Sequence, residues 1–388
     1  MRAVAIAGIG ETPMGKYPDR SLREMIEQAG NAALLDAGVD RSQIQGIYVG
    51  NFNGQVLAGQ GHIGPLVAQT LGMTGVPAIR TEGACASGSL ALLLGIQAIQ
   101  HGIHDVVLVG GIEKMTHRPT GFVTEAIASA MDVDLEVNQG LTFPGSFALI
   151  ANRYFAEHRN VKREMAQVAV NAHSNAMLNP DAQLHKPITI EIALQAAPIA
   201  DPLGLFDCSL VTDGAAFVVL TTTDIARGLG NGHRVVEVVG SGHGGDALTL
   251  AAKRSITSFA ATKQAAAAAY AAAGLEATDI DLAEVHDCFT ITQIINTEDL
   301  GFFAPGMGGD AVAAGTTSLN GSLPINTSGG LKAKGHPIGA TGISQVFEVV
   351  TQLRGDAGAR QVRNHDIGLT HNLGGTGATC VVNILKGV

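Results

Sequence analysis

The chain has 388 residues and a mass of 39.8 kDa; 46% of the residues are hydrophobic, 15% are charged, and the formal net charge is −10 at pH 7. This acidic balance leaves no basic stripe for a phosphate backbone, which argues against direct nucleic-acid binding. The length accommodates two domains, and the 50 glycines, the absence of tryptophan and a mean hydropathy of +0.23 predict tightly packed layers that bury further surface in an oligomer.

The amino terminus begins with an apolar segment, MRAVAIAGIG, that is interrupted by Gly8 and Gly10. It is too short and too rich in glycine for a secretory or membrane segment, so it predicts a first strand. No run of about 18 apolar residues occurs elsewhere, and the final residues, LKGV, are not a peroxisomal address. We therefore expect a cytoplasmic protein that does not bind membranes.

Helices and strands alternate through the first part of the chain. The segment 21–37 has apolar residues at helical spacing, Ser21 and Glu24 form a capping-box pattern at its start, and Gly38 follows its end. The pattern then predicts a strand, a buried helix and a second strand, at 44–52, 87–102 and 104–113. This alternation predicts βαβ units and a mostly parallel sheet.

The same order returns later in the chain, with a strand, a helix and a strand predicted at 235–242, 259–274 and 279–289. A constant offset of 236 residues relates Ala37, Ile44 and Val49 to Ala273, Ile280 and Val285. Because element order and spacing agree, the sequence predicts an internal duplication with two similar α/β layers packed face to face.

A segment rich in Pro, Asn and Met, 114–210, separates the two halves. Its helical stretches predict an insertion folded over one face, and it contains no strong chemical motif. The alternative is a plain helical subdomain that only shapes the surface. We assign the N-terminal half, with the insertion, to 1–230 and the C-terminal half to 231–388.

The four cysteines, at 85, 208, 288 and 380, have neither CxxC nor Cys/His metal spacing, so we predict free thiols and no metal site. Cys85 lies in TEGACASGS, directly before the helix predicted at 87–102. A helix N-terminus stabilises a thiolate and lowers the thiol pKa, and small neighbours let a bulky thioester approach. Cys85 is therefore a candidate nucleophile; a small buried structural cysteine is the alternative.

A histidine, His336, is held between glycines in GHPIGATG (335–342), next to Pro337 and before another helix start. A neutral ring at this place would accept the proton of a nucleophile and then hold a carbonyl oxygen that gains negative charge. The alternative is a glycine-rich phosphate-contact loop, for which Lys332 and Lys334 supply positive charge.

Three polar residues, His286, Asp287 and Cys288, end the strand predicted at 279–289, where α/β folds place ligands. Cys288 is a candidate acid or base for moving a proton on the carbon next to a thioester. His286 is a candidate hydrogen-bond donor to an oxyanion. The spacing does not fit a zinc site.

The segment THNLGGTGATCVVNIL (370–385) predicts a glycine turn followed by the last strand. Backbone N–H groups near Gly374 are candidates for an oxyanion hole, with His371 and Asn372 at its mouth. We predict that Cys380, in the apolar strand, and Cys208 are structural.

Four motifs in this order resemble those of thiolases: ACASGS around Cys85, HDCF at 286–289, GHPIGATG at 335–342 and HNLGG at 371–375. The resemblance spans most of the chain. It is strongest to the sterol-carrier-protein-type and archaeal-type branch, in which HDCF replaces the NEAF motif of the common degradative and biosynthetic enzymes. It implies a duplicated, five-layered α/β/α/β/α fold and an acyltransferase that joins two acetyl-CoA molecules or cleaves a 3-oxoacyl-CoA.

The resemblance also implies a role for each candidate residue. Cys85 would accept the acyl group and His336 would activate it. Cys288 would be the acid/base cysteine, because the CxG motif of common thiolases is replaced by NLG at 372–374. His286 and His336 would bind the thioester oxygen, while the backbone N–H groups of Cys85 and Gly374 would form the second oxyanion hole.

Ligands and partners follow from the same resemblance. Coenzyme A and its acyl thioesters would be substrates, without a permanently bound cofactor; 114–210 would cover the coenzyme A pocket, and Ser241 would contact coenzyme A. A homodimer or homotetramer is expected, with a small zinc and OB-fold protein as a further expected partner. Two alternatives stay open: a thiolase-like lyase that cleaves CoA-linked side chains by retro-aldol chemistry, and a non-catalytic acyl-CoA carrier that acts with such a partner.

Overall fold

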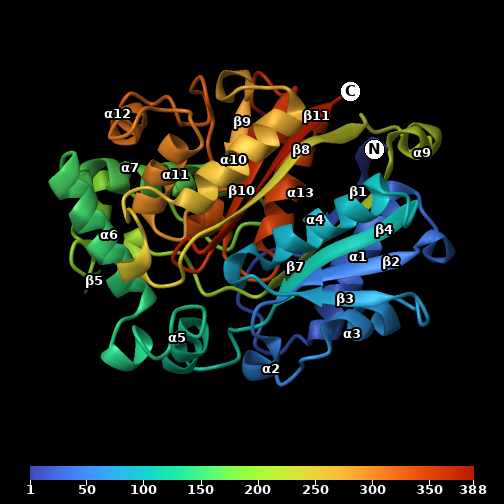
Figure 1. Ribbon diagram of the computed structural model, residues 1–388, viewed down its shortest axis with the longest axis horizontal. Helices are drawn as coiled ribbons and strands as arrows, with labels where there is room; N and C mark the ends of the chain where they lie inside the picture. The colour runs from blue at the N-terminus through green and yellow to red at the C-terminus, as the bar shows by residue number, and fades with distance from the viewer.

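Nine strands form the main sheet, whose order divides at the pair β1/β8 (Figure 1). The computed structural model describes all 388 residues. The first half of the sheet has the order β3 (Ala78–Thr81), β2 (Gly46–Gly50), β4 (Val106–Glu113), β7 (Gly214–Thr222), β1 (Val4–Glu11). The second half continues with β8 (Val236–Gly245), β11 (Thr379–Gly387), β10 (Ile367–Gly374) and β9 (Leu282–Glu284).

The two halves repeat one plan, which confirms the predicted duplication. Outward from the central pair, β1, β7, β4 and β2 correspond to β8, β11, β10 and β9. The helices α1 (Leu22–Ala37) and α10 (Ala260–Ala273) pack on β1 and β8. Both helices end at a glycine in the left-handed conformation, Gly38 with φ 66° and Gly274 with φ 65°. Ser21 and Glu24 form the capping box predicted at the start of α1.

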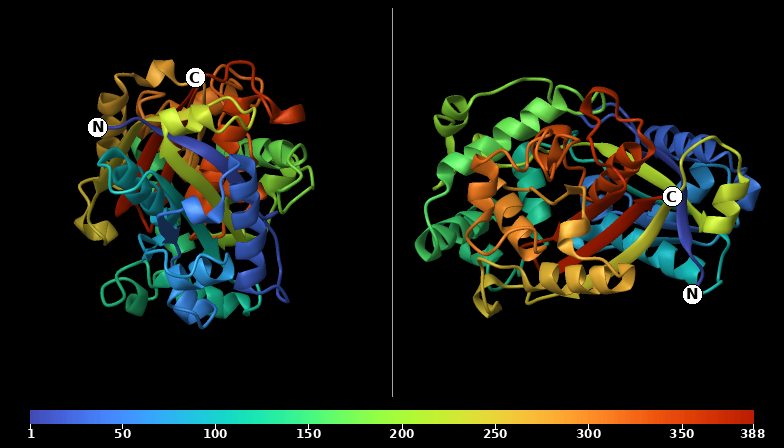
Figure 2. Two further views of the ribbon diagram at one scale, coloured as in Figure 1. Left: turned by 90° about the vertical axis from the view of Figure 1, so that its right-hand side faces the viewer. Right: turned by 90° about the horizontal axis from the view of Figure 1, so that it is seen from above.

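Five layers of helices and strands follow from this repeat. The helices α1 and α10 lie on opposite outer faces (Figure 2), while α4 (Ser87–Gln100) and α13 (Thr341–Arg354) lie between the halves and contact each other. A buried apolar cluster joins both central helices to strands of both halves, through side chains such as Leu92, Ile96, Ile343 and Val346. This arrangement confirms the α/β/α/β/α fold.

The prediction of a mostly parallel sheet is wrong. Only three of the eight strand pairs are parallel: β2/β3, β2/β4 and β9/β10. The reason is that β7, which follows the insertion, runs back between β4 and β1, antiparallel to both. In the second half, β10 and β11 are joined by the tight turn 375–378 and form a hairpin.

The insertion between β4 and β7 is largely helical and lies at one end of the sheet. It contains α5 (Thr120–Ala128), α6 (Phe143–Glu157), α7 (Lys162–Ala176), α8 (Ile190–Leu194) and the short strands β5 (Pro198–Ala200) and β6 (Leu203–Gly204). From the second half, α11 (Thr290–Asp299) and α12 (Gly308–Ala313) pack against α7 at this end, away from both termini (Figure 1). The other helices are α2 (Gly54–Leu57), α3 (Ile63–Thr70) and α9 (Thr223–Gly228). None of the helices combines the length and apolar character that a membrane crossing requires.

Glycines allow the first turns of α4 and α13 to touch. A Cβ on Gly342 of α13 would lie 2.2 Å from Ser89 Oγ of α4 and 2.4 Å from Asn372 Oδ1 of β10. A Cβ on Gly88 of α4 would lie 2.8 Å from the carbonyl oxygen of Gly339. Non-bonded heavy atoms prefer a separation of roughly 3.5 Å or more. A larger side chain at either glycine would therefore push the two halves apart.

We predict that Gly342→Ala lowers the free energy of unfolding by about 1 to 3 kcal/mol, the usual cost of overpacking a core. Gly121→Ala is the matched control, because a Cβ on Gly121, inside α5, meets no heavy atom within 4 Å. The control should be neutral or slightly stabilising, since alanine is the better helix former. Urea denaturation measures both variants. Equal midpoints for Gly342→Ala and the wild type would contradict the close packing.

Candidate active site

A single tight turn between β3 and α4 holds Cys85. The turn, Ala84–Ala86, begins with Ala84 at φ 50°, a conformation that residues other than glycine rarely adopt. Glu82 stabilises this turn, because its carboxylate accepts the N–H of Ala84 at 2.6 Å. The partly buried thiol therefore lies directly before α4, where the sequence places it.

Burial raises the pKa of the Cys85 thiol to about 12, although the N–H of Gly375 donates to the sulfur and acts in the opposite direction. The negative charge of Glu113 raises this pKa further. The lowered pKa expected from the helix N-terminus is therefore wrong, because the loss of water outweighs the helix dipole. At neutral pH the thiol needs a nearby base to take its proton.

Hydrogen bonds fix the proton on the His336 ring. The hydroxyl of Thr341 donates to the carbonyl of Pro337 at 3.0 Å, so its oxygen accepts from Nδ1–H of His336 at 2.7 Å. This tautomer leaves the lone pair on Nε2. Burial lowers the pKa of His336 to about 3, so the ring is neutral near pH 7. His336 therefore has the form that a general base requires.

The loop that carries His336 is anchored from several sides. The backbone N–H of His336 donates to Thr212 Oγ1 at 3.0 Å. The preceding π-helix, Gly330–Lys334, is held by Asp287, whose carboxylate accepts the N–H of Leu331 at 2.7 Å. Burial raises the pKa of Asp287 to about 6. These bonds keep the imidazole ring of His336 in place, and the side chain that bonds to the ring itself is the uncharged Thr341.

The two lysines near His336 do not support the alternative interpretation of this segment as a phosphate-contact loop. Lys332 and Lys334 are each only 3% exposed. Lys334 forms a buried ion pair with Glu11 at 2.9 Å, and the ammonium of Lys332 lies 5.6 Å from the ring centre of Phe206. Their charges are therefore directed into the protein.

The second histidine, His286, has the opposite tautomer. The side-chain amide of Asn372 donates to Nδ1 of His286 at 3.2 Å, which leaves the proton on Nε2. This Nε2 is fully buried and has no hydrogen-bond partner. Burial lowers the pKa of His286 well below its usual value, so the ring is neutral. A buried N–H without a partner is a donor available to a substrate oxygen.

The reactive atoms of three predicted site residues lie together. Side-chain atoms of Cys85, His286 and His336 lie within 4.8 Å of one another, and the two imidazole rings meet edge to face with centroids 5.2 Å apart. His286 reaches this position because the chain leaves the sheet after β9. The backbone N–H of His286 donates to the side-chain Nδ1 of His371 at 3.3 Å, and not to the backbone of a neighbouring strand. The strand predicted at 279–289 is therefore much shorter than expected, Leu282–Glu284.

The second candidate thiol, Cys288, is buried beside this group. It lines the same small cavity as Cys85 and His336. Burial, and then the proximity of Cys85, raise the pKa of Cys288 well above its usual value. Its sulfur lies 3.9 Å from Thr292 Oγ1. Once deprotonated, such a buried thiolate is a strong base.

The residues predicted from the C-terminal strands have different surroundings. Gly374 ends β10 and lines a pocket, while the N–H that reaches the Cys85 sulfur belongs to the next residue, Gly375. His371 Nε2 lies 3.0 Å from the hydroxyl oxygen of Thr262 on α10, on the opposite side of β10 from α13. His371 thus supports the backbone of the His286 loop.

The remaining predicted residues lie away from this group. Cys380 is fully buried in the core, and the thiol of Cys208 donates to the carbonyl of Gly204 at 3.6 Å. Ser241 lies within β8, and its hydroxyl donates to Asn383 on β11 at 2.7 Å. None of the pockets beside the reactive residues is lined by Ser241, so the geometry gives no support to the expected coenzyme A contact.

Two further residues position the site, and sequence reasoning missed both. Thr341, which sets the tautomer of His336, is the threonine of GHPIGATG. Glu113, fully buried at the end of β4, accepts backbone N–H groups from Phe52 at 2.8 Å and from Gly339 at 3.0 Å. It thereby ties a loop of the first half to the His336 loop. Burial raises the pKa of Glu113 to about 7. In the sequence, Glu113 is recognisable only as an acidic residue at the end of a predicted apolar strand.

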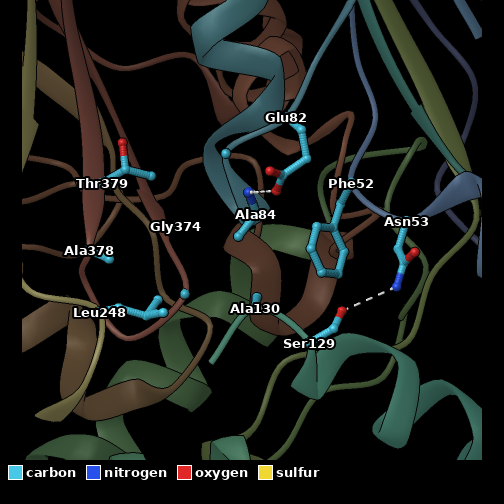
Figure 3. A pocket seen from close by; sticks show the side chains of 12 residues that line it. Phe52, Asn53, Glu82, Ala84, Ser129, Ala130, Leu248, Gly374, Ala378 and Thr379 are labelled. Carbon is cyan, nitrogen blue, oxygen red and sulfur yellow. Dashed lines mark hydrogen bonds between the residues drawn. The ribbon is translucent and has the colours of Figure 1, made fainter. Parts of the chain in front are cut away.

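Three neighbouring pockets, which share lining residues, lie around the reactive atoms. The reactive cavity, about 80 Å³, is lined by Cys85, Cys288 and His336. The outer pocket, about 380 Å³ (Figure 3), shares four lining residues with it: Phe52, Ala84, Ala130 and Gly375. The insert pocket, about 240 Å³, shares six: Ile127, Phe143, Ser209, Phe289, His336 and Ile338. The reactive cavity therefore lies between two larger pockets.

Two family descriptions match nearly the whole chain. Thiolase, N-terminal domain, matches residues 4–224, and Thiolase C-terminal domain-like matches residues 242–387.

Curated relatives and a solved structure share this similarity. Proteins named acetyl-CoA acetyltransferase from Methanothermobacter thermautotrophicus and Methanocaldococcus jannaschii are 46% and 42% identical, with all of this chain and 100% and 99% of theirs covered. Human sterol carrier protein 2 is 33% identical over all of this chain and 72% of its own length. The solved structure of a protein named Ltp2-ChsH2(DUF35) aldolase has a TM-score of 0.86 at 27% identity, covering 99% of this chain and 98% of that chain.

We predict that alkylation of Cys85 by iodoacetamide accelerates by about tenfold per pH unit from about pH 6 to about pH 9, without a plateau. The raised pKa keeps the thiol protonated over this range, so the reactive thiolate fraction grows with each unit. Peptide mass spectrometry separates Cys85 from Cys208, Cys288 and Cys380, and Cys85→Ala gives the background. A plateau below about pH 8 would instead indicate a stable thiolate–imidazolium pair.

Proposed function

The chain belongs to the thiolase family and is an acyltransferase, and we propose that it moves acyl groups between coenzyme A thioesters through a thioester on Cys85. The observation that carries this proposal is the grouping of a thiol, an imidazole with a free lone pair and an imidazole with a free N–H within 4.8 Å. Nucleophile, base and oxyanion donor are the three groups that acyl transfer requires.

In the first half-reaction, Nε2 of His336 takes the proton of the Cys85 thiol. The sulfur attacks the thioester carbonyl carbon, and the developing oxyanion accepts a hydrogen bond from Nε2–H of His286. The bond between the carbonyl carbon and the coenzyme A sulfur then breaks. The leaving thiolate takes the proton of Cys288, which leaves acyl-Cys85, free coenzyme A and a Cys288 thiolate.

In the second half-reaction, the Cys288 thiolate removes a proton from the α-carbon of an acetyl-CoA. The resulting enolate attacks the carbonyl carbon of acyl-Cys85, and the bond from that carbon to the Cys85 sulfur breaks. The Cys85 sulfur recovers its proton from His336, and a 3-oxoacyl-CoA is released. The raised pKa of Cys288 suits this role, because a weakly acidic thiol is a strong base after deprotonation. The reverse sequence is thiolytic cleavage.

Acetyl-CoA and acetoacetyl-CoA are the proposed first substrates, because two archaeal relatives that match over the full chain are named acetyl-CoA acetyltransferase. Coenzyme A would be a substrate that enters and leaves, without a permanently bound cofactor.

We predict that Cys288→Ala separates the two half-reactions. The variant should still form acetyl-Cys85 from acetyl-CoA, detected by peptide mass, because Cys85, His286 and His336 are unchanged; the reaction should be slower, since the coenzyme A thiolate must take its proton from water instead of from Cys288. Thiolysis of acetoacetyl-CoA should fall by about 10² to 10⁴, the contribution of a general acid or base. Cys85→Ala should lose both activities.

Cys380→Ala is the matched control, because Cys380 is a buried cysteine outside the reactive group. It should retain both activities. Full thiolysis by Cys288→Ala would remove Cys288 from the mechanism, and the absence of acetyl-Cys85 in the wild type would contradict the proposal as a whole.

A retro-aldol lyase is the second candidate, favoured by the structural similarity to a protein named an aldolase. Both activities use CoA-linked substrates but differ in products and in the use of coenzyme A. An aldehyde or ketone formed without consumption of free coenzyme A would support the lyase. Acetylation of Cys85 would also exclude a purely inert carrier.

An oligomer and a partner protein are part of the proposed function. The edge strand β3 leaves one side of the sheet unpaired, and Ile79 on it is 49% exposed, which supports association of two copies. The name of the solved relative includes a second component, ChsH2(DUF35), which supports a partner protein for this chain. Light scattering measures the first, and co-purification from the native source tests the second.

A further inference from the structure

The three reactive groups are also ligands that transition metals prefer. Cys85 offers a sulfur, and His286 and His336 each offer a ring nitrogen; these ligand atoms all lie within 4.8 Å of one another. One thiolate with two imidazoles suits Zn²⁺, whereas Mg²⁺ and Ca²⁺ require oxygen ligands. The spacing on which we predicted no metal site compares neighbours in the chain, so it does not detect ligands from three separate segments.

A tetrahedral zinc site needs only a small contraction of this group. With bonds of about 2.0 to 2.3 Å from zinc to nitrogen and sulfur, neighbouring ligand atoms lie about 3.3 to 3.6 Å apart. The three ligand atoms would therefore approach one another by about 1 Å. Cys85 and His336 line the reactive cavity, which has a volume of about 80 Å³. Because this space is open, no other side chain has to leave before an ion enters.

The His336 ring already has the form of a metal ligand. Its Nδ1–H donates to Thr341 Oγ1 at 2.7 Å, and the lone pair of Nε2 is free. Histidines that bind a metal usually donate their other N–H in this way, which fixes the orientation of the ring. His336 would therefore bind the ion without a change of tautomer.

His286 reaches the same form when one amide turns. Its Nε2 has no hydrogen-bond partner, while its Nδ1 accepts from the Asn372 amide at 3.2 Å. Asn372 Oδ1 and Ser89 Oγ also lack partners, and both lie within 2.4 Å of the place that a Cβ on Gly342 would occupy. A half-turn of the amide presents Oδ1 to Nδ1–H and the amide N–H to the Ser89 hydroxyl. Two buried oxygens thereby gain partners, and Nε2 of His286 gains a lone pair.

The charges around the group favour a cation. A Zn²⁺ ion with one thiolate and two neutral imidazoles has a net charge of +1. Burial is the first cause of the raised pKa of the Cys85 thiol, and the negative charges of Glu113 and Glu82 add to it. Charges that oppose a free thiolate stabilise a positive ion at the same place. The carboxyl group of Asp287, directly after His286, is buried as well.

We propose that Cys85, His286 and His336 bind one Zn²⁺ ion, and that this ion holds the enzyme in a reversibly inactive form. The ion replaces the proton of the Cys85 thiol, which passes to water, while the His286 proton moves from Nε2 to Nδ1. No electrons are transferred. A water or a thiol from solution completes the tetrahedron. The ion thus occupies the nucleophile, the base and the oxyanion donor together. The inhibition rests on the proposed function, whereas the binding of zinc does not.

The first experiment titrates metal-stripped protein with ZnCl₂ against a chromophoric zinc chelator. Coenzyme A is left out, because its thiol binds zinc. The wild type should bind one tight equivalent per chain. Cys85→Ala and His336→Ala should weaken the affinity by about 100-fold or more, since loss of an outer partner of a zinc ligand already costs about 10- to 100-fold. Cys380→Ala, in the core, and His101→Ala, at the exposed end of α4, are matched controls that should bind like the wild type.

Two measurements locate the ion without depending on the stability of a histidine variant. One equivalent of Zn²⁺ should slow alkylation of Cys85 by iodoacetamide by about tenfold or more, because a metal-bound thiolate is a poor nucleophile, and should leave Cys208 unchanged. Co²⁺ in place of Zn²⁺ should give a thiolate-to-metal charge-transfer absorption that is absent from Cys85→Ala. Equal zinc affinity in the wild type and Cys85→Ala, or unslowed alkylation of Cys85 in zinc-saturated protein, would overturn the proposal.

Inhibition is measured on the first half-reaction, acetylation of Cys85 by acetyl-CoA, which has no free thiol to remove the ion. One equivalent of Zn²⁺ should slow the formation of acetyl-Cys85 by about tenfold or more, and excess EDTA should restore it. Unchanged acetylation of zinc-saturated protein would overturn the inhibitory role. If zinc-free wild type forms no acetyl-Cys85, the proposed function fails and the inhibitory role fails with it, whereas the titration decides on zinc binding by itself.

Discussion

The contact between the first turns of α4 and α13 is the constraint on which the site depends. Gly88 and Gly342 leave no room for side chains, so the two helices of the duplicated halves start side by side. Cys85 precedes the first of these helices and His336 precedes the second. The duplication thus does more than double the fold. It places a nucleophile from one half against a base from the other, and the glycines set the distance between them.

Burial then determines the chemistry of the residues brought together. The loss of water keeps His336 and His286 neutral, and their neighbours decide which nitrogen carries the proton: an acceptor, Thr341, for the first and a donor, Asn372, for the second. Two identical side chains thereby differ in function, one as base and one as donor. Carboxyl groups lie one residue contact further away: those of Glu113 and Asp287 accept backbone N–H groups and hold the loops that carry the reactive residues.

How much of this follows from the sequence depends on how local the cause is. The capping box of α1, its glycine stop and the repeat at α10 are encoded within a few residues, and they were predicted correctly. The antiparallel course of β7 depends on where the chain returns after the insertion, which no local pattern records. The sequence predicts the wrong direction for the pKa of Cys85 for a similar reason, because desolvation is set by the whole fold whereas the helix N-terminus is visible in the sequence. The histidine tautomers require hydrogen-bond geometry.

The asymmetry between the halves explains why the site has two unlike pockets. In the first half, β4 and β7 are joined by the long helical insertion; in the second, the corresponding strands β10 and β11 are joined by the turn 375–378 alone. The insertion folds over the reactive cavity and supplies most of the insert pocket. The short turn covers nothing, and its residues Gly375 and Ala378 line the outer pocket instead. A repeat of equal halves would enclose the thiol equally from both sides. Unequal connections leave a covered apolar side and an open side around one reactive thiol.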